Sequence, residues 1–152
     1  ENIMLLDLES IMEEWKKDAE IPQHKLDDVS RQTPSLHAKY LQYLSLTKLQ
    51  LKRTEHSQAI LLKDKWAYYN GKMSREEIEA TGWNPDPFNG LKILKGELEY
   101  YYNADPELQR SEEKIAYLNT IISTLTEIVD SLKWRHQTIG NIIKWRAFEA
   151  GG

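Results

Sequence analysis

The chain of 152 residues contains no cysteine, so a disulfide framework and a thiolate metal site are excluded. Glycine and proline are scarce, at seven and five residues, and the long periodic stretches between them favour an all-α fold. No apolar run approaches the roughly 18 residues of a membrane span, and no signal peptide opens the sequence. We therefore expect a single helical domain, residues 1–152, in a reducing cytosol.

An excess of positive charge is also missing, because the net charge is −4. The charges are unevenly distributed, however. Residues 36–72 hold six lysines, one arginine and two acids, whereas residues 1–30 hold three lysines and nine acids. One concentrated basic segment in an acidic chain indicates local attraction of an anionic partner rather than bulk attraction.

The first 72 residues are predicted to form two helices. Apolar residues recur at helical spacing from Ile3 to Ala19, and Pro22 ends that pattern. Thr33-Pro34 predicts the start of a second, long helix, because a hydroxyl cap followed by proline suits the first helical position. Asn70-Gly71 predicts its end.

Residues 73–104 are predicted to form a capped turn, a loop and a helix. A capping box at Ser74 opens one or two turns through Ala80. Two prolines and two glycines then predict a short irregular insertion at about 81–90, which we expect Trp83 and Phe88 to anchor. Helical spacing returns at 91–103.

Residues 105–150 are predicted to form a C-terminal, coiled-coil-like helix, which Asp105-Pro106 caps. A heptad repeat places apolar residues in its core positions, with His136 as a polar register device. Ile121, Ile128 and Ile142 widen this stripe, so either the chain's other helices or several copies of this helix must cover it. We favour copies, and assign oligomerisation to Ile115, Leu118, Ile122, Leu125, Val129, Leu132, Ile139 and Ile143.

The basic segment of the long helix is the candidate functional region of the sequence. On a helical wheel, Lys48, Lys52, His56 and Lys63 fall within about 80° of one another. The residues that follow are basic and aromatic: Lys65, Trp66, Tyr68, Tyr69 and Lys72. A row of cations suits phosphates, and unpaired bases stack on aromatic rings. The pattern is therefore typical of single-stranded nucleic acid binding, although Lys65 and Lys72 project toward the apolar side of an ideal helix.

Other interpretations compete with this one. A lysine stripe is often the solvated face of an amphipathic helix, and the chain would then be a structural coiled-coil assembly protein without a nucleic-acid role. Catalysis is disfavoured, because the sequence has no phosphate-binding glycine loop and no Gly-x-Ser-x-Gly motif. The four histidines lack metal-ligand spacing, so we expect no metal and no cofactor.

Two motifs carry a resemblance to a known family. Leu62–Lys72 reads LKDKWAYYNGK, and the end of the chain reads RAFEAGG from Arg146. Both blocks, in this order, resemble the UvsY family of recombination mediators of T4-type phages. The resemblance implies an all-α protein that is not an enzyme and that acts in the cytoplasm of an infected bacterium.

The resemblance also implies the partners. Members of the family bind single-stranded DNA as ring-like homo-oligomers of six or seven copies. They help to load a recombinase onto DNA that a single-strand-binding protein already covers. The family's basic pair falls on Lys63 and Lys65 here, and the C-terminal helix becomes the self-association element.

Overall fold

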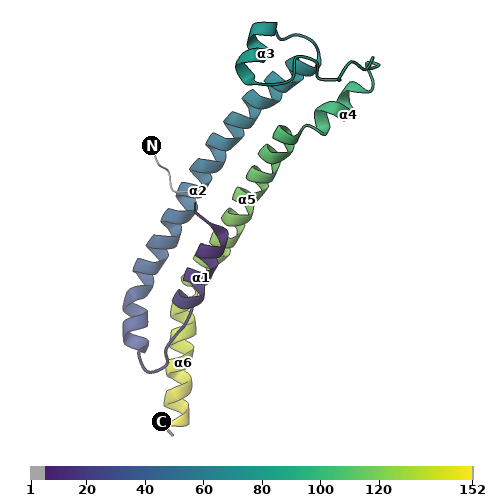
Figure 1. Ribbon diagram of the computed structural model, residues 1–152. Coiled ribbons are helices and arrows are strands. Elements are labelled where there is room, and N and C mark those ends of the chain that lie inside the picture. Colours follow the sequence, from purple (N-terminus) through teal and green to yellow (C-terminus); the bar gives the residue numbers. More distant parts are fainter. Residues whose placement is uncertain (1–5, 152) are drawn as a thin grey trace. The chain divides into compact units, whose positions relative to one another are not determined.

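The computed structural model describes residues 6–151, which fold into helices joined by turns and one irregular connection (Figure 1). The described residues contain no strand, which confirms the all-α prediction. In chain order the helices are α1 (Leu8–Asp18), α2 (Leu26–Tyr69), α3 (Arg75–Thr81), α4 (Leu98–Asn103), α5 (Pro106–Lys133) and α6 (Arg135–Glu149).

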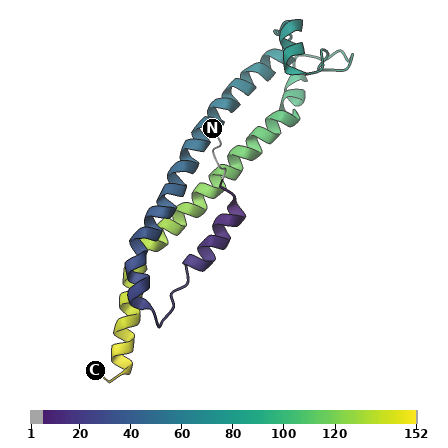
Figure 2. The ribbon, with the colours of Figure 1, turned by 60° about the vertical axis from the view of Figure 1, so that its left-hand side comes forward.

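The residues group into two compact units, whereas the sequence predicted one domain in three successive segments. The terminal unit comprises the residues up to Gln50 and those from Leu118 onward. The middle unit comprises Leu51–Tyr117. Within the middle unit, α3 and α4 lie at the end where α2 stops and α5 starts, as Figures 1 and 2 both show.

Helix α1 begins where a side chain caps it. The Asp7 carboxylate accepts a hydrogen bond from the Ser10 backbone N–H at 3.1 Å, which satisfies one of the unpaired donors of the first turn. The helix therefore starts at Leu8 rather than at Ile3, and residues 3–5 of the predicted helix lie outside the described residues.

Helix α2 starts earlier than predicted and contains Pro34. Leu26 and Val29 are buried against Ile139, so tertiary packing orders the first turns ahead of the proline. Pro34 has no backbone N–H and therefore cannot donate the usual helical hydrogen bond. In the preceding residue, the Thr33 hydroxyl donates to the Val29 carbonyl at 2.8 Å. The prediction that Thr33 caps the helix was wrong, because burial outweighed the local signal.

The end of α2 follows the prediction. Gly71 adopts a left-handed conformation with φ of 69°, and the Lys72 backbone N–H donates to the Ala67 carbonyl at 2.8 Å. These are the features of a glycine-terminated helix. The chain consequently turns back at Lys72 instead of continuing along the helix axis.

The insertion between α3 and α4 is longer than expected. The capping box at Ser74 is present, since Ser74 and Glu77 bond to each other's backbone N–H groups. After it, helical structure resumes only at Leu98, so the predicted helix over 91–103 was wrong for residues 91–97. The Glu97 carboxylate accepts from the Leu94 backbone N–H at 3.3 Å, and a turn forms there instead.

The core of the terminal unit consists of side chains from α1, α2 and α5. Tyr40, Ile121 and Leu125 have no exposed surface. The full cluster is Ile11, Tyr40, Leu44, Ile121, Leu125, Ile128, Val129 and Leu132. The chain's own helices therefore cover this part of the heptad stripe.

This packing revises the sequence-based assignment of the stripe to contacts between copies. Leu118, Leu125, Val129 and Leu132 are buried within a single chain, so a second copy could reach them only if this core opened. Ile115 and Ile122 are half-buried, and Ile139 is buried against the first turns of α2. Only Ile143 among the eight assigned residues is exposed.

The C-terminal helix is interrupted at Trp134, where α5 gives way to α6. The interruption lets the Arg135 guanidinium donate to the backbone carbonyls of Asp18 and Glu20 at 2.7 and 2.9 Å, which satisfies acceptors at the end of α1. His136 is exposed, so its expected role as a buried register residue was wrong.

Candidate nucleic-acid interface

The outward face of α2 in the middle unit carries exposed cations and one exposed aromatic ring. Lys52 and Lys63 are both exposed, and the Lys63 side chain retains 77% of its accessible surface. Trp66 is 49% exposed, one helical turn beyond Lys63. Lys48, also exposed, lies on the part of α2 that belongs to the terminal unit.

Lys72 joins this face through the turn that ends α2. Its ammonium lies 4.6 Å from the centroid of the Trp66 ring. The wheel of an ideal helix placed Lys72 on the apolar side, but the helix stops at Tyr69 and the left-handed Gly71 directs the chain back toward Trp66. A cation over an indole ring at an exposed site contributes about 0.5–1 kcal/mol. The contact places a positive charge over one face of the half-exposed Trp66 ring.

Lys65 does not belong to this face. Its ammonium lies 3.0 Å from Asp105 and 3.6 Å from Glu107, and its side chain is only 5% exposed. It also lies 3.9 Å from the centroid of the Trp83 ring. In this arrangement the charge of Lys65 is paired inside the middle unit, so its predicted contact with phosphate does not fit the structure.

Tyr68 and Tyr69 are also occupied within the middle unit. Tyr68 is buried, and its hydroxyl donates to the Asn84 carbonyl at 2.6 Å. The Tyr69 hydroxyl donates to Asp105, also at 2.6 Å. The two rings contact each other edge to face and reach Trp83 and Phe88 of the insertion. These tyrosines therefore support the end of α2, and their hydroxyl groups are engaged within the middle unit.

Asp105 is the residue that sequence reasoning missed. It was recognised as a helix cap, and its carboxylate does accept the backbone N–H groups of Glu107 and Leu108. The same carboxylate also pairs with the Lys65 ammonium and accepts a hydrogen bond from the Tyr69 hydroxyl, both from α2. The capping signal is local, whereas these two partners lie far away in the sequence. Trp83 was expected to anchor the insertion, and it does so against Lys65 and Glu107.

The electrostatics of this cluster keep Asp105 charged. Burial by itself would raise the pKa of its carboxyl group, but hydrogen bonds from Tyr69, Lys65 and the Leu108 backbone bring the pKa below its ordinary value. The pKa of the Tyr69 hydroxyl is raised, first by burial and then by its bond to that carboxylate. At neutral pH the Asp105 carboxyl group is therefore charged, and it lies 3.0 Å from the Lys65 ammonium.

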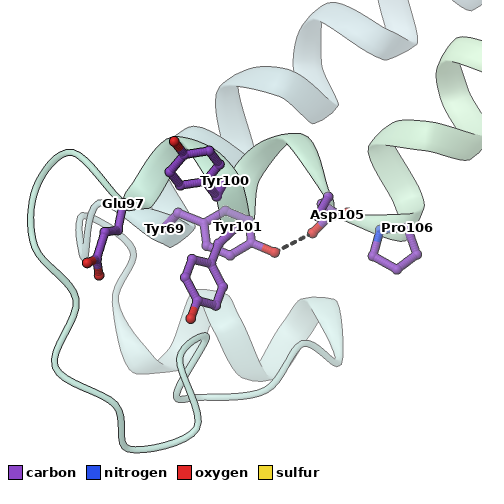
Figure 3. Close-up of a pocket in the computed structure, with 7 residues that line it drawn as sticks. Tyr69, Glu97, Tyr100, Tyr101, Asp105 and Pro106 are labelled. Carbon is purple, nitrogen blue, oxygen red and sulfur yellow. Dashed lines mark hydrogen bonds between the residues drawn. The ribbon is translucent and has the colours of Figure 1, made fainter.

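A hollow of about 630 Å³ lies beside this cluster in the middle unit. Its lining is aromatic and acidic: Tyr69, Glu97, Tyr100, Tyr101, Ala104, Asp105 and Pro106 (Figure 3). The Tyr69 hydroxyl points toward Asp105, as the dashed bond in Figure 3 shows. No lysine or arginine lines it, so it offers nothing that would neutralise a phosphate.

Metal and membrane sites are not indicated. Across residues 6–151, no group of three or more histidine or acidic side chains is arranged to hold a metal ion. The helices of the same residues include none that is both long and apolar enough to cross a membrane.

Comparison with known proteins is consistent with this architecture. The family described as "Recombination, repair and ssDNA binding protein UvsY" matches residues 14–152. The recombination protein uvsY of Enterobacteria phage T4 is 27% identical over 144 residues, which cover 95% of this chain and 98% of the T4 protein.

Solved structures agree. A crystal structure of the bacteriophage T4 recombination mediator protein UvsY, lattice type II, has a TM-score of 0.77 at 26% identity and covers 96% of this chain and 99% of its own. The lattice type I structure has a TM-score of 0.74 at 25% identity, with coverage of 92% and 98%. The fold and these matches define the class as all-α proteins of phage recombination and repair. Within this class, the chain belongs to the UvsY family, which confirms the resemblance seen in its two motifs.

Proposed function

We propose that this protein is a recombination mediator that binds single-stranded DNA as a homo-oligomer. It helps to load a recombinase onto DNA covered by a single-strand-binding protein, in the cytoplasm of the infected host, and catalyses no reaction itself. Membership of the UvsY family supports the role in recombination. The single observation that carries the DNA contact is the exposed row of Lys52, Lys63 and Trp66 on α2, which Lys72 joins from the turn after the helix.

The exposed row suits a single strand better than a duplex. Lysine ammonium groups neutralise phosphates, and the half-exposed Trp66 ring offers a stacking surface that only an unpaired base can use. Lys48 of the terminal unit is also exposed and is proposed as a further phosphate contact. Lys65, Tyr68 and Tyr69 are left out, because their polar atoms already have partners.

Self-association would use the exposed apolar residues of α6. Ile143, Trp145 and Phe148 are 50%, 61% and 70% exposed, and the last two rings stack with centroids 5.7 Å apart. Large exposed apolar side chains grouped on one helix commonly mark a protein–protein interface. Copies of α6 are the proposed partner, in a ring for which the resemblance implies six or seven subunits.

A ring gives weak single contacts a combined strength. Each copy would present the same basic row, so one strand could engage several rows in succession, and each new contact would be intramolecular. A strand held in this way would be bent along the ring and kept accessible for transfer to a recombinase.

The proposal is tested by titrating the purified protein with fluorescently labelled oligothymidylate and with a matched duplex at several salt concentrations. Size exclusion with light scattering is run in parallel to measure mass. We expect an oligomer that binds the single strand more tightly than the duplex, with affinity that falls steeply as salt rises. An oligomer without salt-dependent binding would instead identify a structural assembly protein.

A further inference from the structure

One carboxylate joins the end of α2 to the start of α5. Asp105 accepts hydrogen bonds from the Lys65 ammonium at 3.0 Å and from the Tyr69 hydroxyl at 2.6 Å. It also accepts the backbone N–H groups of Glu107 at 2.9 Å and Leu108 at 3.2 Å, at the start of α5. The side chains of Lys65 and Asp105 are 5% and 3% exposed, so water does not replace these contacts.

The insertion between α3 and α4 also contacts Lys65 and the start of α5. The Trp83 ring lies under the Lys65 ammonium, and its indole N–H donates to Glu107 at 2.8 Å. The Tyr68 hydroxyl donates a hydrogen bond to the Asn84 carbonyl. Through these bonds Lys65 connects the last turns of α2, the insertion after α3 and the first turn of α5.

A charge so deeply buried cannot lose its partner without consequence. An unpaired charge in a protein interior carries a large desolvation cost, so the surrounding structure opens to admit water when one member of a buried pair is removed. Here the segments that would separate include the turn of α2 that carries Trp66 and leads to Lys72.

We propose that Lys65 is a positioning residue for DNA binding: its buried pair with Asp105 fixes the end of α2 so that Lys63, Trp66 and Lys72 form one surface. This inference rests on the proposed function. It gives Lys65 a role different from that of Lys63, although the two residues belong to the same sequence motif.

The two possible roles of Lys65 make opposite predictions for Asp105→Asn. If Lys65 bound phosphate, removing the nearby negative charge would release the lysine and strengthen DNA binding. If Lys65 is a positioning residue, the same substitution weakens DNA binding, because it removes the nearer of the two carboxylates that pair with the buried lysine, Asp105 at 3.0 Å, and leaves only Glu107 at 3.6 Å. Asparagine remains a good helix cap, so the start of α5 is retained.

The experiment measures affinity for labelled oligothymidylate against salt concentration, together with the melting temperature, for Lys65→Met, Asp105→Asn and Lys63→Ala. We expect Lys65→Met and Asp105→Asn each to lower both the affinity and the melting temperature, with the slope of log affinity against log salt unchanged. We expect Lys63→Ala to flatten that slope by about 0.7 per engaged subunit, with an unchanged melting temperature.

The double variant Lys65→Met with Asp105→Asn keeps the test decisive if a single variant folds poorly. It removes both buried charges of the pair, so melting temperature and affinity should recover together relative to Lys65→Met. Recovery of the melting temperature without recovery of affinity would overturn the inference. So would a flattened salt slope in Lys65→Met or tighter binding by Asp105→Asn.

Failure of the proposed function has a different signature. In that case the wild-type protein shows no salt-dependent binding to the single strand, and Lys63→Ala has no effect, whatever happens at Lys65.

Discussion

Lys63 and Lys65 are two residues apart on α2, yet their side chains are 77% and 5% exposed. Residues two apart on a helix point in nearly opposite directions, so one lysine faces solvent while the other enters the middle unit. A single basic motif therefore supplies both a solvent-exposed lysine, Lys63, and a buried lysine, Lys65.

The exposed lysine is expected to act directly on DNA. Lys63→Ala should weaken single-strand binding and lower the slope of log affinity against log salt by about 0.7 for each subunit engaged, because each neutralised phosphate releases counterions. Oligomer mass and melting temperature should not change. Fluorescence anisotropy over a series of salt concentrations measures the slope.

Lys133 offers a matched control for Lys63. Each lysine is exposed and lies 3.6 Å from a neighbouring aspartate, Asp64 for Lys63 and Asp130 for Lys133. Lys133→Ala removes the same charge from α5 and should leave the salt slope as it is. Equal slopes for the two variants would exclude a specific contact by Lys63.

Trp66 is expected to contribute through its ring rather than through charge. Base stacking on an aromatic side chain contributes about 1–3 kcal/mol per base, so Trp66→Ala should lower single-strand affinity at least about fivefold. The salt slope should remain unchanged. Trp66→Phe keeps an aromatic face and should retain most of the affinity.

Trp134, which is 67% exposed, is the control for Trp66. Trp134→Ala should leave DNA binding unaltered. A Trp66→Ala variant that binds as tightly as the wild type would restrict the DNA contact to the lysines.

Local signals in the sequence predicted much of the fold. The capping box at Ser74, the glycine end of α2 and the cap at Asp105 all lie where their residues indicate, because each depends on contacts within a few positions. The start of α2 was missed, since Leu26 and Val29 are ordered by packing against Ile139, which is remote in the sequence.

The candidate site shows the same limit. The wheel placed Lys65 on the apolar side of α2, and the structure finds it inside the middle unit. No local sequence pattern, however, predicts that Lys65 pairs with Asp105, which lies forty positions further along the chain. Likewise, the heptad indicated a wide apolar stripe, but periodicity does not specify whether Leu125 packs against the same chain or against another copy.

Acid is expected to destabilise the fold through two carboxyl groups, the half-buried Asp18 and the buried Asp105. In both Asp18 and Asp105, burial raises the pKa, but hydrogen bonds to neighbours bring it below the ordinary value. A group whose pKa is lower in the folded state stabilises that state above its unfolded pKa, about 3.9 for aspartate. That stability is lost as the pH falls through the folded pKa, so unfolding free energy should decrease below about pH 4.

Urea titrations followed by circular dichroism at pH 7 and pH 3 measure this loss. Asp105→Asn should be less stable than the wild type at pH 7 and should lose less stability on acidification, because asparagine does not titrate. Asp18, which is held by Lys39 and Tyr40, accounts for part of the loss that remains. An Asp105→Asn protein with the wild-type difference between the two pH values would contradict this expectation.

The exposed end of α6 is expected to set the mass of the oligomer. Replacing Trp145 and Phe148 by alanine removes two large apolar side chains, each worth about 1.5–3 kcal/mol when fully buried at an interface. The loss would repeat in every subunit of a ring. We therefore expect the double variant to elute as a monomer or small oligomer, with light scattering giving its mass.

Two controls separate assembly from folding in this prediction. Tyr100→Ala removes a ring that is 76% exposed in the middle unit and should leave the mass unchanged. Leu125→Ala acts on the core of the terminal unit and should lower the unfolding free energy by about 2–5 kcal/mol. The α6 double variant should instead keep wild-type helicity, because both rings lie outside that core. If it retains the wild-type mass at micromolar concentration, α6 is not the interface, and copies must meet through another surface.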